Sequence, residues 1–181
     1  MNLDYSKINK ITINEPIKLD CGVTLDKFDI AYETFGELDE SKSNAILIFH
    51  ALSGDQFVTG TNKVTGRGGW WNFVVGPNLP IDTEKYFIIC ANVIGGCMGS
   101  SGPKEINPKT NKPYGLDFPV ITIKDMVSAQ VHLLDFLGIK KTRCVLGGSM
   151  GGMQALLFCS LYPVRTFSAV PIACAASHSA Q

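Results

Sequence analysis

Apolar and polar residues alternate in the first part of the chain, and this alternation stops after residue 44. Residues 17–21 and 28–32 each carry an apolar side chain at every second position, and Cys21-Gly22 provides a turn between them. Alternation of period two with a glycine break is typical of a half-buried antiparallel hairpin. We therefore expect these two segments to pair as an N-terminal hairpin.

Four short segments after residue 44 are apolar without alternation, as in strands that are buried on both faces of a sheet. They are Ala45–Phe49, Phe87–Ala91, Arg143–Leu146 and Phe167–Ile172. Apolar residues recur every three or four positions over Ile123–Leu137 and Met150–Tyr162, which predicts helices ended by Gly138 and Pro163. Such strand–helix alternation predicts an α/β fold: a mostly parallel sheet with right-handed crossovers and an N-terminal antiparallel hairpin.

Two long segments, 50–72 and 95–115, have no regular period. The first is rich in Gly, Thr and Ser, and the second contains five Gly and three Pro. Each follows a predicted buried strand, so both are expected at the carboxyl edge of the sheet, where open α/β sheets bind ligands.

The charge balance narrows the possible partners. Sixteen Lys and Arg residues offset 16 Asp and Glu residues, whereas nucleic-acid binders and polybasic membrane-surface proteins show a basic excess. With 45% hydrophobic and 18% charged residues the composition is that of a folded protein with a core, and the length suits one domain. There is neither an N-terminal apolar segment nor a run of 18 apolar residues, so we expect a cytoplasmic protein without a signal peptide or membrane span.

The six cysteines are too few for a disulfide scaffold. None forms a C-x-x-C pair, and no Cys/His group has the spacing of a zinc site, so no metal centre is expected. Most of them stand in apolar runs, which predicts buried thiols.

The motif Gly147-x-Ser149-x-Gly151 lies between a predicted buried strand and a predicted amphipathic helix. This is the context of a nucleophile elbow, in which a strained turn raises a serine above the sheet and glycines allow the close approach of helix and strand. The helix N-terminus offers the free N–H of Met150 to an oxyanion. A Gly-rich turn is the alternative, and a Walker loop is excluded because Met153 replaces its Lys.

His50-Ala51-Leu52 follows the predicted strand Ala45–Phe49. A hydrolase-type site needs a second oxyanion donor from this loop, and the candidate is the backbone N–H of Leu52. His50 is expected to brace the loop, with catalysis as a base the less favoured alternative. A Cys97/His50 thiol pair is a further, weaker alternative.

A catalytic triad on this fold runs Ser, then Asp or Glu, then His. No acidic residue follows Ser149, and His178 is the only later histidine. His132 falls inside a predicted helix and is expected to be a surface or half-buried helix residue. The sequence thus supplies a nucleophile and two oxyanion donors without the triad acid and base.

Five motifs in this order resemble the homoserine O-acetyltransferase family, α/β-hydrolase-fold acyltransferases, and the resemblance runs from about Leu19 to the last residue. The resemblance implies that residues 1–181 are the N-terminal portion of a single domain, truncated after about the sixth strand. The motifs are His50-Ala51-Leu52-Ser53-Gly54, Gly69-Trp70-Trp71-Asn72, Asn92-Val93-Ile94-Gly95-Gly96-Cys97, Ser100-Ser101-Gly102-Pro103 and Gly147-Gly148-Ser149-Met150-Gly151-Gly152-Met153-Gln154-Ala155.

The resemblance implies a two-step acyl transfer. Ser149 would attack acetyl-CoA, a co-substrate rather than a bound cofactor, while the N–H groups of Leu52 and Met150 hold the oxyanion. The hydroxyl of L-homoserine would then take the acetyl group, in methionine biosynthesis. Family members are expected to be homodimers with a helical lid and a substrate-binding arginine, both C-terminal to these residues.

Several alternatives stay open. Within the family they are a homoserine O-succinyltransferase and a serine O-acyltransferase; outside it they are an esterase or thioesterase, and an inactive fragment that lacks the triad Asp and His. Trp70 and Trp71 are expected to pack under a long loop, with Arg67 and both tryptophans at the mouth of an acyl-CoA tunnel as the alternative. Phe167–Ile172 is expected to leave an unpaired apolar sheet edge, and therefore a poorly soluble chain.

Overall fold

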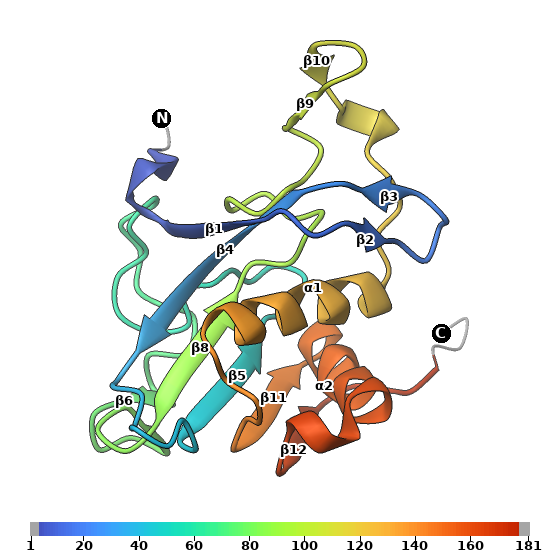
Figure 1. Cartoon of the computed structure of the whole chain (residues 1–181). Coiled ribbons are helices and arrows are strands. Elements are labelled where there is room, and N and C mark those ends of the chain that lie inside the picture. The colour runs from blue at the N-terminus through green and yellow to red at the C-terminus, as the bar shows by residue number, and fades with distance from the viewer. Residues whose placement is uncertain (1–3, 178–181) are drawn as a thin grey trace.

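The structure is a computed structural model, and it describes residues 4–177. Six strands form the central sheet, in the order β1-β4-β8-β5-β11-β12 (Figure 1). Strands β8, β5, β11 and β12 are mutually parallel, and β4 pairs antiparallel with both β1 and β8. The strands are β1 (Asn9–Ile13), β2 (Ile17–Lys18), β3 (Thr24–Leu25), β4 (Phe28–Phe35), β5 (Ala45–Phe49), β6 (Val75–Gly76), β7 (Ile81–Asp82), β8 (Phe87–Ala91), β9 (Ile106–Asn107), β10 (Lys112–Pro113), β11 (Cys144–Gly148) and β12 (Ala169–Ile172).

Two α-helices and three short 3₁₀ turns complete the described elements. They are α1 (Ile123–Phe136), α2 (Met150–Leu161), η1 (Tyr5–Lys7), η2 (Gly115–Asp117) and η3 (Pro163–Arg165). A capping box starts α1: the Thr122 side chain accepts from the N–H of Asp125, whose carboxylate accepts from Thr122. Gly138, with φ of 68°, follows its end. The predicted strands and helices after residue 44 are thus confirmed, with ends shifted by one or two residues.

The predicted N-terminal hairpin is wrong in its pairing. Residues 28–32 do lie in β4, but β4 pairs with β1, in the register Ile11 opposite Ile30. Residues 17–21 form only the short β2, which pairs with β3 around the turn at Gly22. Ile11 and Ile13 carry the buried alternation that β4 needs, and β2 and β3 make a small separate hairpin between the two long strands.

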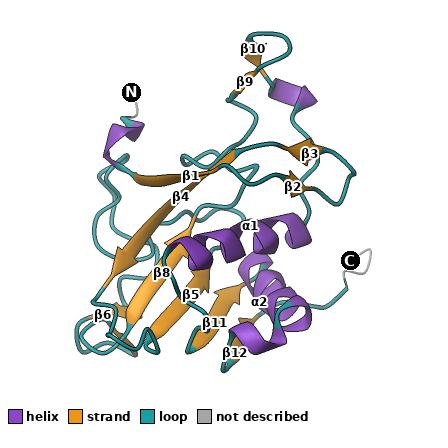
Figure 2. Cartoon of the chain, in the orientation of Figure 1, coloured by secondary structure: helices purple, strands orange, loops and turns teal. Residues whose placement is uncertain are grey.

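Both α-helices cover the same face of the sheet (Figure 2). The inward side chains of β5, Leu47 and Phe49, are fully buried there and belong to one core cluster with Leu134 of α1 and Phe158 of α2. α2 is apolar around its whole circumference rather than amphipathic, and Leu161 at its end is 40% exposed. The prediction of an amphipathic helix at this position is therefore wrong.

The opposite face of the sheet is covered by irregular chain. Ile46 and Ile48, the other side chains of β5, are buried against Val58 and Val75 of the long segment that follows β5. Trp70 and Trp71 pack on this second cluster. A half-buried ion pair anchors the same segment to the sheet: the Lys63 ammonium lies 2.8 Å and 2.9 Å from the two carboxylate oxygens of Glu33, a residue only 4% exposed.

Candidate active site

Ser149 occupies the sharp turn between β11 and α2. It is the N-cap of α2, with φ 55° and ψ −121°, a conformation that costs a non-glycine residue about 1–3 kcal/mol. A Cβ atom at Gly147 or Gly151 would collide with the Phe49 carbonyl oxygen, so both positions require glycine. The chain thus forms a strained strand-turn-helix junction, and Ser149 is exposed on it.

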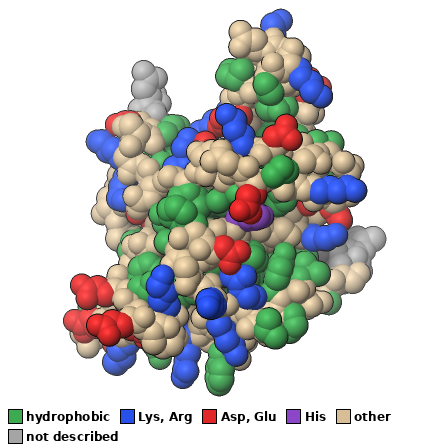
Figure 3. All heavy atoms as spheres, viewed as in Figure 1, with side chains coloured by type: hydrophobic (Ala, Val, Ile, Leu, Met, Phe, Trp, Pro, Cys, Tyr) green, Lys and Arg blue, Asp and Glu red, His purple; other side chains and the backbone are tan. Residues whose placement is uncertain are grey.

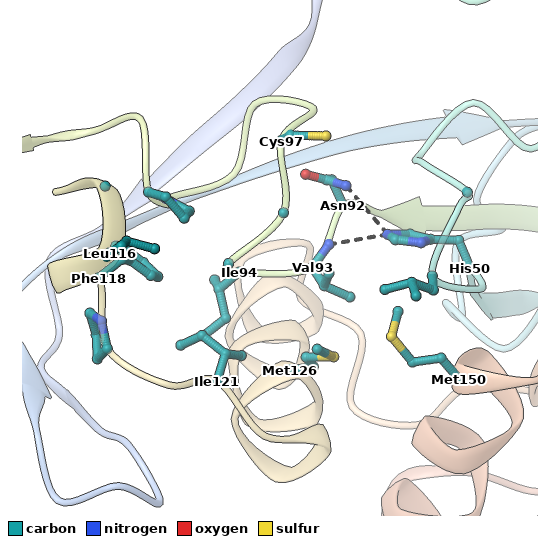
Figure 4. A pocket seen from close by; sticks show the side chains of 17 residues that line it. His50, Asn92, Val93, Ile94, Cys97, Leu116, Phe118, Ile121, Met126 and Met150 are labelled. Atoms are coloured by element: carbon teal, nitrogen blue, oxygen red, sulfur yellow. Dashed lines mark hydrogen bonds between the residues drawn. The ribbon is translucent and has the colours of Figure 1, made fainter. Parts of the chain in front are cut away.

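The N–H of Met150 begins α2 and has no acceptor within the described residues. The Leu52 N–H, in the turn after β5, also has none. Both residues line one pocket of about 410 Å³ at the carboxyl edge of the sheet (Figure 4). The structure therefore places Leu52 and Met150, the two backbone donors that the sequence singled out, at one pocket. Ser149 directly precedes Met150 in the chain and is not itself among the residues that line the pocket.

The rest of the pocket is mostly apolar. Val93 and Ile94 after β8 form one wall, and Met126 of α1 and Met150 of α2 contribute thioether side chains (Figure 4). Leu116 of η2 is fully exposed at its margin. No Asp, Glu, Lys or Arg lines the pocket in the described part of the chain.

His50 is a buried structural residue, 2% exposed. Its Nδ1 lies 2.7 Å from the Ala51 carbonyl oxygen, and its Nε2 accepts from the Val93 N–H at 3.2 Å. Burial lowers the pKa of His50. The hydrogen bond to the Ala51 carbonyl and the charge of Asp55 act in the opposite direction but do not cancel this effect. With both ring nitrogens engaged, His50 has none left for a substrate or for Cys97, which is exposed at the pocket. These contacts support the loop-bracing hypothesis over the two catalytic alternatives.

Two buried amide residues, which stand in the quoted motifs but were given no role there, support the site. Asn92 follows β8; its Oδ1 accepts from the Met98 N–H at 3.1 Å, and its Nδ2 faces His50 Nε2 at 3.4 Å. Gln154 of α2 accepts from Gln130 Nε2 at 3.0 Å, and its own amide lies 3.4 Å from the Met150 carbonyl. In the sequence, each of these residues is an amide inside an otherwise apolar segment. A buried amide requires hydrogen-bond partners, and this was the signal that could have indicated their roles.

The remaining candidates lie outside the pocket. Trp70 donates its indole N–H to the Asp55 carbonyl and stacks on Trp71 at 5.1 Å, and neither lines the pocket, which supports the packing role. Arg67 is exposed on the same segment. His132 is a half-buried residue of α1, with its ring edge-on to Phe28. His178 lies outside the described residues.

The cysteine prediction is partly wrong. All six thiols are free, but only Cys90 is buried, and burial raises its pKa. Cys21 and Cys97 are exposed because they stand in turns, where an apolar neighbourhood in sequence does not bury a side chain. Within residues 4–177 no cluster of potential metal ligands was found, and neither described α-helix has the length and apolarity to cross a membrane.

Residues 44–179 match a family of proteins described by the alpha/beta hydrolase fold. The chain belongs to this family. Its curated relatives include the homoserine O-acetyltransferase of Pelagibacter ubique, 61% identical over all 181 residues, and that of Nitrobacter hamburgensis, 58% identical over 97% of the chain. The chain spans about half the length of these relatives, 48% and 44%. The predicted resemblance to homoserine O-acetyltransferases is thus confirmed.

Solved structures with the same fold include both a homoserine O-acetyltransferase and an esterase. The homoserine O-acetyltransferase of Bacillus anthracis superposes with a TM-score of 0.82 at 33% identity, over 90% of this chain and 45% of that one. Esterase E22 superposes with a TM-score of 0.80 at 36% identity, over 88% and 45%. The predicted α/β-hydrolase fold is confirmed, and at this level of identity the fold accommodates both transfer to an alcohol and ester hydrolysis.

Proposed function

We propose that the chain carries the acylation half of a homoserine O-acetyltransferase active site, the part that accepts the acetyl group from acetyl-CoA. The observation that supports this most directly is the strained Ser149 between β11 and α2, beside a pocket lined by Leu52 and Met150. Identities of 56–61% to eight curated homoserine O-acetyltransferases support the transferase over the esterase.

The mechanism follows from this geometry. The Ser149 oxygen attacks the thioester carbonyl of acetyl-CoA, and its proton goes to a base that these residues do not supply. The carbonyl oxygen becomes an oxyanion, which accepts hydrogen bonds from the N–H groups of Leu52 and Met150. The C–S bond then breaks and the base gives its proton to the sulfur, so that CoA leaves as the thiol and acetyl-Ser149 remains. Attack by the L-homoserine hydroxyl forms O-acetyl-L-homoserine and regenerates the serine, a step of methionine biosynthesis.

The lining of the pocket favours acetyl over succinyl as the transferred group. A succinyl group carries a carboxylate, which proteins bind with Arg or Lys. The described lining is apolar apart from His50 and Asn92, whose side chains are engaged with each other and with the backbone. The small neutral acetyl group therefore fits this half of the site better.

The test replaces the matching half of the Pelagibacter ubique enzyme with residues 1–181. Without L-homoserine the hybrid is expected to release at most one CoA per active site, from the acylation of Ser149, and sustained CoA release is expected only when L-homoserine is present. The same hybrid with Ser149→Ala is expected to lose both. Sustained CoA release that does not depend on homoserine would indicate a thioesterase, and hydrolysis of simple acetyl esters without transfer would indicate an esterase.

The isolated 181-residue chain is the matched control. It has no acidic residue after Ser149 and therefore cannot supply a triad in the usual order. We expect negligible transferase activity from it. Steady acetylation of homoserine by the purified chain would contradict this assignment of roles.

A further inference from the structure

The peptide unit between Ala51 and Leu52 is held from its carbonyl side. The Ala51 oxygen accepts two hydrogen bonds, from His50 Nδ1 at 2.7 Å and from the Gly54 N–H at 2.9 Å. A trans peptide is planar, and its C=O and N–H point in opposite directions. Two donors on the oxygen therefore fix the direction of the Leu52 N–H on the other side of the same plane.

The His50 ring that makes the first of these bonds is itself fixed in tautomer and orientation. A backbone N–H can only donate, so the Val93 N–H at 3.2 Å requires an unprotonated Nε2. The ring proton of neutral His50 is then on Nδ1, where it can be donated to Ala51. Asn92 adds to this: its Oδ1 is occupied by the Met98 N–H, which turns its Nδ2 toward His50 Nε2 (Figure 4).

We infer that His50 is a positioning residue, which aims the Leu52 N–H at the reacting oxygen by holding the Ala51 carbonyl. Through Val93 the same ring ties the loop after β5 to the loop after β8, two segments that are 43 positions apart in the chain and that both line the pocket. The inference rests on the proposed function, because it assigns Leu52 the role of an oxyanion donor. His50 contacts no reacting atom in this role.

Two substitutions separate positioning from simple packing. His50→Leu removes both ring nitrogens, whereas His50→Asn removes the acceptor for Val93 but keeps a short amide donor that can reach the Ala51 oxygen. Both variants thus leave the Val93 N–H unpaired, and they differ in the contact to Ala51. His132→Asn, on α1 outside the pocket, is the matched control for loss of an imidazole.

The experiment measures kcat and KM of the hybrid enzyme described above. Losing an oxyanion donor lowers rates by about 10²–10³-fold, so His50→Leu is expected to lower kcat within that range with KM for homoserine unchanged. The kcat of His50→Asn is expected to be at least about tenfold higher than that of His50→Leu, because Asn restores part of the donor's effect. His132→Asn should leave both constants unchanged. Equal kcat values for His50→Leu and His50→Asn, in variants with the same melting temperature, would overturn the inference.

A second measurement does not depend on activity. In the hybrid labelled with ¹⁵N-histidine, the signal that disappears in His50→Asn is expected to show a neutral ring with its proton on Nδ1. A proton on Nε2 would overturn the inference even if the enzyme is active. An inactive parent hybrid with an Nδ1-protonated His50 would instead contradict the proposed function and leave the predicted ring geometry supported.

Discussion

The backbone N–H of Ser149 donates a hydrogen bond to the carbonyl oxygen of Ile172, 3.0 Å away. This bond extends the parallel pairing of β11 with β12 by one residue into the turn. It holds the strained Ser149 backbone against the end of β12, while Gly147 and Gly151 allow the strand and helix to approach Phe49. The backbone that carries the candidate nucleophile is thus bonded to the end of β12 and packed closely against the end of β5.

The strain at Ser149 gives a first prediction. Glycine adopts positive φ without penalty, whereas alanine does not. We expect Ser149→Gly to be more stable to urea unfolding than Ser149→Ala by about 1 kcal/mol, the lower end of the usual cost of such strain. Both variants of the hybrid enzyme should be inactive. Equal stabilities would show that the turn stores no strain at this residue.

The parts of the fold that follow from local pattern were predictable. Five-residue apolar runs identified β5 and β8 with their observed bounds, and the three-to-four spacing placed α1 to within one residue. The elbow could be located because Gly147-x-Ser149-x-Gly151 stands directly between a buried apolar run and a segment of helical spacing. These elements are determined mainly by residues near in sequence.

The partner of β4 and the supports of the pocket were not predictable in the same way. β1 was missed because only two side chains, Ile11 and Ile13, mark its buried face. The roles of Asn92 and Gln154 depend on partners 42 and 24 positions away, His50 and Gln130. Which distant groups a buried amide meets is a property of the folded chain, and one sequence does not contain it explicitly.

Protonation of His50 should weaken the fold at mildly acidic pH. Burial lowers its pKa below the ordinary 6.5, so between the two values the unfolded chain binds a proton that the folded chain does not. The stability from neutral His50 is fully present above pH 6.5 and is lost as pH falls through the lowered pKa. Urea unfolding at a series of pH values should show this decline, and His50→Asn should flatten it.

The carboxylates lose their contribution to stability in a lower pH range than His50, so the two effects can be separated. The backbone hydrogen bond from Glu84 and the contact with Lys85 lower the pKa of Asp82 below 3.8. Burial of Asp29 raises its pKa, but the contacts with Lys10 and Thr12 outweigh this and lower it below 3.8. Their contributions are present above that pH and are lost only in stronger acid. A decline near pH 6 that is unchanged in His50→Asn would contradict the assignment to His50.

The buried amide pair between the two helices should behave non-additively. Gln130 and Gln154 are 1% and 0% exposed, and Gln130 Nε2 donates to Gln154 Oε1 at 3.0 Å. Gln130→Leu alone leaves a buried acceptor unpaired and should cost about 1–3 kcal/mol. The double variant with Gln154→Leu removes both polar groups and should regain most of that loss. Additive costs in a double-mutant cycle would show that the amides do not interact.

The ion pair under the long segment after β5 should also contribute to stability. Lys63→Met removes the cation that pairs with the Glu33 carboxylate, which is 4% exposed. The carboxylate then keeps the Asn9 side-chain amide as a donor, at 3.2 Å. Because Lys63 is itself 44% exposed, we expect a loss of about 1–3 kcal/mol, below the value for a fully buried pair. Lys124→Met, which breaks an exposed pair with Asp20, should cost less than about 1 kcal/mol. Equal losses in the two variants would contradict the structural role of Lys63.

The outer edge of β12 should make the 181-residue chain associate with itself. In the described sheet β12 is a terminal strand, with Val170 46% exposed and Ile172 39% exposed, and Phe167 just before it is 70% exposed. Figure 3 shows hydrophobic side chains among Lys and Arg at this end of the molecule. An unpaired edge with apolar side chains can pair with another chain, and an edge lysine hinders such pairing.

Val170→Lys is therefore expected to shift the chain from associated to monomeric species in gel filtration and sedimentation velocity. Val164→Lys is the matched control: Val164 is 76% exposed on η3, outside any strand, so this change removes a comparable apolar surface without blocking the edge. If both variants improve solubility equally, general apolar exposure rather than strand pairing drives association. A clean monomeric profile with a sharp unfolding transition for the unmodified chain would show that the edge is tolerated, since β12 would then be stable on its pairing with β11 alone.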